Sequence, residues 1–380
     1  MRITYVYKLY NASRNNTLHR AIDTCGEIWN YCTGHINQCY QQHNKLISKY
    51  DLQKHLTLVK KQELYLNWAQ VGSQAIQNIT DRIYLSYSQF FQKCKKGMKA
   101  TSPSFKKIKK YKSLTLKQTG YKLLERNKIR IGNKLYKYHK SREIKGDINT
   151  VTIKRDNLGD IYLFITCTVE DTPAKKSVTS GNIVGIDFGL KTFLTLSDGT
   201  VYTAPLYYTQ GLQEFKKVAK EFSTKQKGSH NKEKAYYELC HRYKKVSNQR
   251  HDFFHKLAKE LTEKYDVICI EDLNIAAMKR LWGRKVSDLA FTKFVSILKY
   301  HCQKSVTKLI TIDRFYPSSK QCHRCFELHE DLGLQDRIWT CALCRTTHDR
   351  DYNAAKNIER VGASTLGLGD VRPTLLAITV

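Results

Sequence analysis

Four cysteines near the end of the chain have the spacing of a zinc site. They form two Cys-x-x-Cys pairs, Cys322 with Cys325 and Cys341 with Cys344. Two such pairs fit one tetrahedral Zn²⁺ with four thiolate ligands at about 2.3 Å. The intervening residues 326–340 are enough for a hairpin that brings the pairs together. Four unrelated buried thiols would not explain this spacing, and disulfides are not expected in a chain without a secretory signal.

Three acidic residues predict a second site of different chemistry. Asp187 interrupts the apolar stretch 182–196, and a carboxylate inside such a strand is costly unless a partner compensates its charge. Glu271 lies at the carboxyl end of the apolar stretch 266–273, where α/β sheets present functional groups. Asp351 begins a segment with helical spacing directly after the second cysteine pair. A satisfied buried aspartate remains an alternative for Asp187 taken alone.

The ligand types separate the two sites. In a strand, Val267, Cys269 and Glu271 share one face, so Asp272 lies on the other and is the weaker candidate. Carboxylate oxygens favour Mg²⁺, with Mn²⁺ as a substitute, whereas thiolates favour zinc. Two Mg²⁺ ions about 3.5–4 Å apart would clamp the attacking water and the leaving oxygen of a phosphodiester. The acids therefore suggest a nuclease rather than a free-standing zinc finger.

Composition supports a nucleic-acid partner. Lys plus Arg number 65 against 34 Asp plus Glu, which gives a net charge of +31 and points to a polyanion. The 24 tyrosines suit base stacking, although many will belong to the core. A membrane surface is the rival partner, but no apolar run of 18 residues is present. The other cysteines show no pairing pattern, so we expect reduced thiols in a cytoplasmic protein.

The N-terminal half predicts a small β-barrel or sheet with a helical insertion. Residues 2–10 alternate as a strand, and residues 14–92 are mainly helical. One apolar stripe contains Ala21, Cys25, Ile28, Trp29 and Cys32, and another contains Ala75, Ile79, Ile83, Leu85, Phe90 and Phe91. A strongly basic segment follows from Lys93. Further strands are expected at 128–131, 150–154 and 161–169, with a turn at 157–160.

The C-terminal half predicts an α/β unit that positions the acids. A polar linker at 173–180 precedes the strand with Asp187, a tight turn at 197–200 and a basic helical hairpin over 212–264. The strand with Glu271, a helix over 291–307 and a strand over 308–314 then lead to the cysteine pairs.

Four stretches, GIDFGLKTFLTLSDGT, DVICIEDLNI, DRFYPSSKQCHRC…CALC and HDRDYNAAKNI, resemble the three RuvC motifs and the zinc ribbon of the TnpB family, the OrfB-type proteins of insertion sequences. The resemblance is dense from about 181 to 360 and looser before. It implies an RNase H-like (RuvC) domain with an inserted zinc ribbon, preceded by a wedge-type β-barrel that carries a helical recognition insertion. That family is related to type V CRISPR effectors, and its activity is RNA-guided DNA cleavage beside a short adjacent motif.

The resemblance also implies roles and boundaries. The catalytic acids and Mg²⁺ ligands fall on Asp187, Glu271 and Asp351, which leaves Asp349 a neighbour. The expected domains are 1–13 with 93–172 (wedge), 14–92 (recognition insertion), 173–315 with 349–362 (RuvC), 316–348 (zinc ribbon) and 363–380 (tail). The expected partners are a guide RNA derived from the transposon end and double-stranded target DNA with its adjacent motif. The expected location is a prokaryotic cytoplasm, associated with the nucleoid and not with a membrane.

Nucleic-acid contacts are expected on the basic segments and on the helical insertion. Gln74 and Gln77 are candidates for reading the adjacent motif, because amide side chains suit bidentate contacts to adenine. The other candidates are Lys106, Lys107, Lys109, Lys110, Tyr111, Lys112, Thr115, Lys225, Lys227, Asn248 and Arg250. For any one of these residues, an ordinary solvated side chain is the alternative.

Two other functions remain open at this point. One is a binding-only repressor that uses an RNA guide but does not cut DNA. The other is a transposase that uses the same RNase H-like acids for strand transfer. Because all three acids are present, the sequence favours the nuclease over the repressor.

Overall fold

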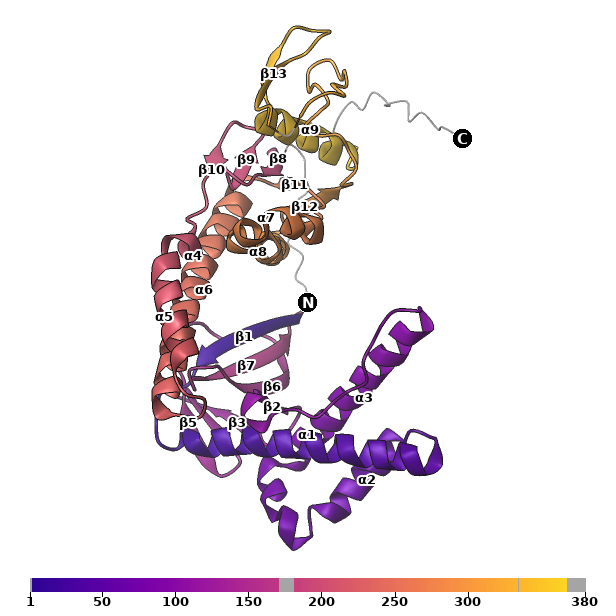
Figure 1. Cartoon of the computed structure of the whole chain (residues 1–380), viewed down its shortest axis with the longest axis vertical. Coiled ribbons are helices and arrows are strands. Elements are labelled where there is room, and N and C mark those ends of the chain that lie inside the picture. The colour runs from indigo at the N-terminus through magenta and orange to yellow at the C-terminus, as the bar shows by residue number, and fades with distance from the viewer. Residues whose placement is uncertain (1, 171–180, 334, 368–380) are drawn as a thin grey trace. The chain divides into compact units, whose positions relative to one another are not determined.

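The computed structural model describes residues 2–170, 181–333 and 335–367 (Figure 1). The chain divides into two compact units, residues 1–172 and 173–380. The predicted linker at 173–180 lies outside the described residues, as does most of the predicted tail 363–380. The first two residues of that tail instead end the last helix, at Ser364.

The first unit contains two antiparallel sheets. The larger has the order β1-β7-β6-β2, with β1 (Arg2–Lys8), β2 (Ser113–Leu116), β6 (Asp147–Arg155) and β7 (Ile161–Thr168). The smaller contains β3 (Tyr121–Leu124), β4 (Lys128–Ile131) and β5 (Lys134–Lys137). Alternate residues of β7 are buried, as a strand with one face in a core requires. The strands predicted at 128–131, 150–154 and 161–169 are confirmed.

The helical insertion is also confirmed. It consists of α1 (Asn15–His43), α2 (Lys49–Val59) and α3 (Ser73–Lys95), with short 3₁₀ segments at Glu63–Val71 and Ile108–Lys110. The predicted stripe on α1 lies in the core, apart from the half-buried Ala21. The stripe on α3 was partly wrong, because Leu85 and Phe91 are exposed. Leu85 follows buried Ile83 by two residues, about 200° around the helix, so Tyr87 continues the buried face instead.

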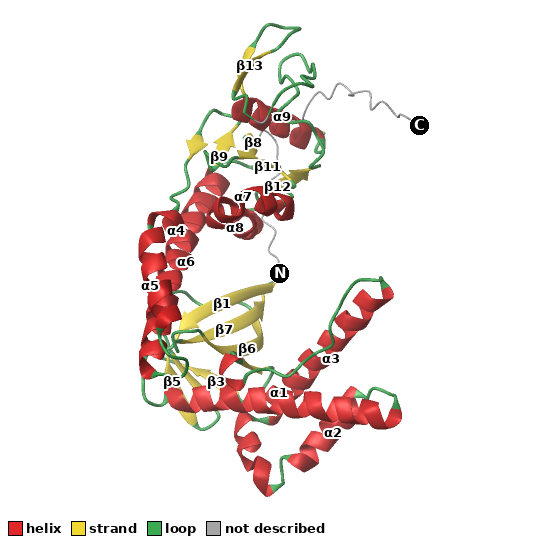
Figure 2. Cartoon of the chain, in the orientation of Figure 1, coloured by secondary structure: helices red, strands yellow, loops and turns green. Residues whose placement is uncertain are grey.

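The second unit is built on a five-stranded sheet with the order β10-β9-β8-β11-β12. Its strands are β8 (Ile183–Phe188), β9 (Leu194–Leu196), β10 (Val201–Tyr202), β11 (Val267–Glu271) and β12 (Lys308–Ile312). Strands β8, β11 and β12 are parallel, and β9 and β10 continue the sheet antiparallel (Figure 2). The predicted strands around Asp187 and Glu271 are therefore adjacent in the sheet.

Helices cover both faces of this sheet. One face packs against α6 (His230–Lys264) and α8 (Phe291–Ser305), and the other against α9 (Arg350–Ser364). Helices α4 (Tyr207–Gln210), α5 (Leu212–Thr224) and α7 (Ile275–Leu289) complete the set, and α5 with α6 confirms the predicted hairpin. The predicted helix 291–307 ends earlier because Val306 has a left-handed backbone, with φ 64°.

Two glycines allow α9 to approach the sheet closely. A Cβ atom on Gly185 of β8 would lie 2.0 Å from the carbonyl oxygen of Ala355 on α9. A Cβ atom on Gly362 of α9 would lie 2.2 Å from the Sγ atom of Cys269 on β11. Real side chains do not fit at these distances, so the helix can lie this close only because both positions are glycine.

Candidate active site and metal centre

The three predicted acids converge on the face of the sheet that α9 covers. Asp187 alternates with Gly185, whose Cα faces α9, and Glu271 alternates with Cys269, which packs there too. Strands β8 and β11 are paired with Ile186 opposite Ile270, so Asp187 and Glu271 follow at the same sheet edge. Asp351 lies in the first turn of α9. Segments far apart in sequence thus deliver three carboxylates to one place.

Burial and crowding change the acidity of two of these groups. The pKa of Asp187 is raised to about 8, first by burial and then by the carboxylates of Asp351 and Glu271, while Arg350 lowers it. Burial also raises the pKa of Glu271, while a hydrogen bond from Ser318 Oγ, 3.4 Å from Glu271 Oε2, lowers it. Negative charge is therefore disfavoured at this point unless a cation compensates it.

The neighbouring acids have other partners. Asp349 caps α9, because its Oδ1 accepts a hydrogen bond of 2.9 Å from the backbone N–H of Tyr352. Asp272 lies on the opposite face from Glu271 and forms an ion pair with Arg314. Asp351 is held by Arg337, whose Nη1 lies 3.0 Å from Oδ1 and 3.2 Å from Oδ2. Asp349 therefore caps a helix, whereas Asp272 and Asp351 are each paired with an arginine.

The donor set of Asp187, Glu271 and Asp351 fits a hard divalent cation such as Mg²⁺, because it offers only carboxylate oxygens. The raised pKa of Asp187 points the same way, since a cation would compensate the negative charge that burial and the neighbouring carboxylates disfavour. Among residues 2–170, 181–333 and 335–367, one group of potential ligands is compact enough to hold a single ion. That group is the cysteine cluster and not the three acids.

The ligand atoms of Cys322, Cys325, Cys341 and Cys344 all lie within 4.8 Å of one another. The predicted convergence of the two pairs is therefore confirmed, and the arrangement is compatible with a structural zinc. A small hairpin of β13 (Ile338–Thr340) and β14 (Thr347–Asp349) flanks the second pair. The Nε2 atom of His348 lies 3.0 Å from Cys322 Sγ, so this histidine supports the cluster from outside.

The two cysteine knuckles have the same backbone geometry. In the first, Phe326 N–H donates to Cys322 C=O at 2.9 Å, and in the second Arg345 N–H donates to Cys341 C=O at 3.0 Å. Phe326 and Arg345, which directly follow the second cysteine of each pair, have positive φ values of 70° and 58°. Each knuckle is thus a local turn that is closed by its own backbone hydrogen bond.

Two asparagines that sequence reasoning missed attach the ribbon to α9. Asn353 and Asn357 are fully buried and donate to the carbonyl oxygen of Gln321 at 2.7 and 2.6 Å. Asn357 also donates to the carbonyl oxygen of Ser318 at 2.8 Å, and Ser318 contacts Glu271. The signal was present in the sequence as two amides spaced i, i+4 on one face of the helix that Asp351 begins.

The predicted nucleic-acid residues before β2 have mixed environments. Lys107, Lys109 and Lys110 are exposed, although Lys109 lies 3.3 Å from Asp23. Lys106 is half-buried with Nζ 3.3 Å from the centre of the Trp29 ring, and burial lowers its pKa. Tyr111, another candidate for a nucleic-acid contact, is only 4% exposed, so its ring is not open for base stacking. The pattern could not distinguish this core tyrosine from a surface one.

Other predicted contacts are partly engaged within the first unit. The Oε1 atom of Gln74 accepts hydrogen bonds from the backbone N–H groups of Lys117 and Gln118, at 3.1 and 2.7 Å. Gln74 therefore holds the segment after β2, whereas Gln77 is exposed. Lys112 is half-buried, and Thr115 shares a hydrogen bond of 2.9 Å with Thr152.

On the basic hairpin, Lys225, Lys227 and Asn248 are exposed. Arg250 instead forms an ion pair of 2.7 Å with Asp288, which is buried and also accepts from the Thr209 hydroxyl at 2.7 Å. This pair joins α6, α7 and α4, which explains the position of Arg250 without a nucleic acid. None of the described helices is long and apolar enough to span a membrane.

Two sequence families match separate parts of the chain. Residues 164–281 match OrfB_IS605, described as "Probable transposase", and residues 291–358 match the Cas12f1-like TNB domain. Asp187 and Glu271 lie within the first match. The four cysteines and Asp351 lie within the second.

Curated relatives carry related names. A "Putative RNA-guided DNA endonuclease" of Streptomyces pristinaespiralis is 36% identical over 59% of this chain and 56% of its own length. InsQ of Escherichia coli strain K12, named "Putative RNA-guided DNA endonuclease InsQ", is 24% identical over 93% of this chain and 90% of its own. "TnpB-like protein L79" of Acanthamoeba polyphaga mimivirus is 31% identical over 56% of this chain and 43% of its own.

The chain thus spans about half the length of the Streptomyces and mimivirus relatives and most of the Escherichia coli one. Among solved structures, one described as "Cryo-EM structure of the Cas12f1-sgRNA-target DNA complex" matches with 12% identity and a TM-score of 0.35, over 94% of this chain and 99% of that chain.

Proposed function

The chain resembles the TnpB family, as the matched sequence families and curated relatives confirm, and from this premise we propose that it is an RNA-guided DNA endonuclease. A guide RNA derived from the transposon end pairs with one strand of the target. The protein reads a short adjacent motif and the shape of the heteroduplex. The net charge of +31 supports polyanionic partners for both roles.

We assign phosphodiester hydrolysis to Asp187, Glu271 and Asp351. The observation that carries this assignment is their convergence from β8, β11 and α9 on one face of the sheet. Two Mg²⁺ ions held by these carboxylates would supply Lewis-acid stabilisation of the attacking water and the leaving oxygen. The chain itself fixes the geometry: paired strands hold two acids side by side, and the close packing of α9 holds the third over them.

We assign the rest of the chain to domains that position this site and bind nucleic acid. Residues 173–315 and 349–362 form the RNase H-like RuvC domain, and residues 316–348 form a structural zinc ribbon on Cys322, Cys325, Cys341 and Cys344. The antiparallel sheets of the first unit are the wedge domain, and α1, α2 and α3 are its recognition insertion. We place the protein with the nucleic acid of a prokaryotic cytoplasm.

The test begins with sequencing the RNA that copurifies with the protein. The complex is then offered a plasmid that carries the guide's complement beside a randomised motif, with Mg²⁺ or Mn²⁺. We expect cleavage at targets with one preferred motif and none without the RNA. Glu271→Ala should bind the same RNA and DNA without cutting. Cutting without RNA, or cutting by Glu271→Ala at the parental rate, would refute the proposal, and binding without any nicking would favour a repressor.

Strand transfer is the second candidate, and the match of residues 164–281 to a family described as "Probable transposase" favours it. The same acids could activate a 3′ hydroxyl instead of water. Incubation with transposon-end DNA separates the two, because strand transfer joins DNA ends into new products whereas hydrolysis only releases them. Joined products that form without a guide RNA would select the transposase.

A further inference from the structure

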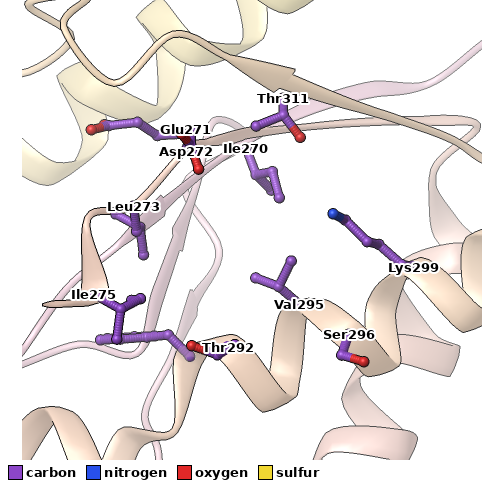
Figure 3. Close-up of a pocket in the computed structure, with 11 residues that line it drawn as sticks. Ile270, Glu271, Asp272, Leu273, Ile275, Thr292, Val295, Ser296, Lys299 and Thr311 are labelled. Carbon is purple, nitrogen blue, oxygen red and sulfur yellow. The ribbon is translucent and has the colours of Figure 1, made fainter. Parts of the chain in front are cut away.

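A cavity of about 350 Å³ lies directly beside the candidate active site (Figure 3). It opens between the end of β11, Thr311 of β12, the start of α7 and one side of α8. Its wall contains the buried Ile270 and Phe291 together with the half-buried Leu273, Ile275 and Val295. The volume is at the lower end of the range of about 300–1,000 Å³ that is usual for small-ligand pockets. It therefore suits one nucleoside-sized group and not a folded partner.

Polar groups from α8 and β12 border this apolar wall. They are the hydroxyls of Thr292, Ser296 and Thr311 and the ammonium group of Lys299. Within the described part of the chain, none of the four has a hydrogen-bond or ion-pair partner. Figure 3 shows Lys299 directed toward the space between α8 and Thr311. An apolar surface flanked by hydroxyls and one cation matches a base with its phosphate.

The charge of the pocket is favourable for an anion. Asp272 lines it, but Arg314 compensates this carboxylate through an ion pair. Figure 3 shows the Glu271 side chain directed away from Lys299 and Val295. Lys299 is therefore the one cationic side chain among the lining residues. A phosphate is attracted to it, and a cationic or peptide ligand has no comparable partner.

We propose that this pocket receives one nucleotide of single-stranded DNA, next to the phosphate that the three acids cleave. This inference rests on the proposed nuclease function. Glu271 and Asp272 are consecutive and face opposite sides of the sheet, so a DNA strand that crosses the end of β11 passes both the acids and the pocket. The pocket fixes which phosphate reaches the acids, because it holds the adjacent base against the half-buried Leu273, Ile275 and Val295.

Photo-crosslinking tests the pocket independently of cleavage. The full protein is mixed with single-stranded DNA that carries 5-iododeoxyuridine, irradiated, and the crosslinked peptides are identified by mass spectrometry. We expect crosslinks to the segments 270–275 and 291–299. Val295→Trp, which fills the cavity, and Lys299→Ala should each reduce them about tenfold, as loss of one base or phosphate contact predicts. Lys304→Ala, an exposed lysine on the same helix, is the matched control and should not.

The cleavage assay then links the pocket to the reaction. If the chain is an RNA-guided nuclease, Val295→Trp should retain guide binding and shift or slow cutting about tenfold. If the pocket crosslinks form but neither the parent nor any variant cuts DNA, the pocket proposal stands and the nuclease assignment is refuted. Absence of crosslinks in the parent protein, or crosslinks that survive in both Val295→Trp and Lys299→Ala, would refute the pocket proposal. Lys299→Ala is an exposed substitution, so its result does not depend on the folding of Val295→Trp.

Discussion

The second unit contains two candidate metal sites that are built in opposite ways. The cysteine cluster is local, since both knuckles are closed by their own backbone hydrogen bonds within 25 residues of sequence. The acid site is assembled from β8, β11 and α9, and it exists only if those elements pack at the right distance. A local site depends on turn geometry and ligand chemistry. A composite site depends on the packing of the whole unit, so a change in packing should damage it and leave the local site intact.

The largest effect should come from the composite site. Replacing Glu271 with Ala should lower the cleavage rate about a thousandfold, because several kcal/mol of transition-state stabilisation depend on each metal-binding carboxylate. Asp349→Asn is the matched control, since an asparagine still caps α9 and the rate should stay near that of the parent. The measurement is single-turnover cleavage of a guided target. Equal losses in both variants would contradict the assignment of roles within the acid group.

Loss of a zinc ligand should affect both sites. Cys341→Ser should reduce the zinc content from about one ion per chain to nearly none, measured by metal analysis. Because Asn353 and Asn357 join the ribbon to α9, disorder in the ribbon should displace Asp351 and lower cleavage about a hundredfold.

The exposed Cys94 offers a control, and Cys94→Ser should change neither quantity. Full activity in zinc-free protein would show that the acid site does not depend on the ribbon.

The reverse dependence should be absent. Gly185→Ala should destabilise the unit by about 1–3 kcal/mol or more, since its Cβ would meet the Ala355 carbonyl oxygen and push α9 away. Cleavage should fall, but zinc content should stay at the parental level because both knuckles are local. Gly283→Ala is the control, because nothing lies within 4 Å of its added Cβ. Zinc loss in Gly185→Ala would remove the distinction between the two sites.

The sequence was sufficient to predict that the two cysteine pairs converge, and it named three candidate acids, but it did not contain their arrangement. Cysteine spacing alone predicted the cluster, because one short segment contains all its ligands. Strand alternation placed Glu271 and Asp272 on opposite faces, as their different partners reflect. Two features depend on tertiary packing and are not contained in any local sequence pattern. They are the register between β8 and β11 and the close approach of α9 to the sheet at Gly185. For the same reason, composition could not separate the buried Tyr111 from exposed tyrosines.

Acidity offers a finer test of the crowding at the composite site. The folded-state pKa of Asp187 is raised to about 8, above its ordinary value near 4, so the folded protein binds one more proton than the unfolded chain between these limits. This group therefore makes the metal-free protein less stable as pH rises from about 4 to 8. Asp187→Asn should flatten that part of the stability curve in chemical denaturation with EDTA. An unchanged slope would show that Asp187 is already ionised at neutral pH.

The smallest effect should come from the contact that joins the two sites. Arg337, next to β13, holds Asp351 with one nitrogen between both carboxylate oxygens, so its cation competes with any metal there. The pair is partly exposed, with 43% and 21% of the two side chains accessible, and such pairs contribute at most about 1 kcal/mol. Arg337→Gln should therefore lower the Mg²⁺ concentration for half-maximal cleavage up to about fivefold.

Arg345→Gln is the matched control for loss of one positive charge from the ribbon, and it should leave that concentration unchanged. The Mn²⁺ concentration for half-saturation, measured by direct binding in target complexes that do not cut, should fall in Arg337→Gln by the same factor as the Mg²⁺ requirement for cleavage. Both should change together because Arg337 competes with metal binding and does not affect the chemical step. If Arg337→Gln instead raised the Mg²⁺ requirement, Arg337 would be a partner of the substrate phosphate. The ribbon would then contribute to the acid site through charge as well as through the position of α9.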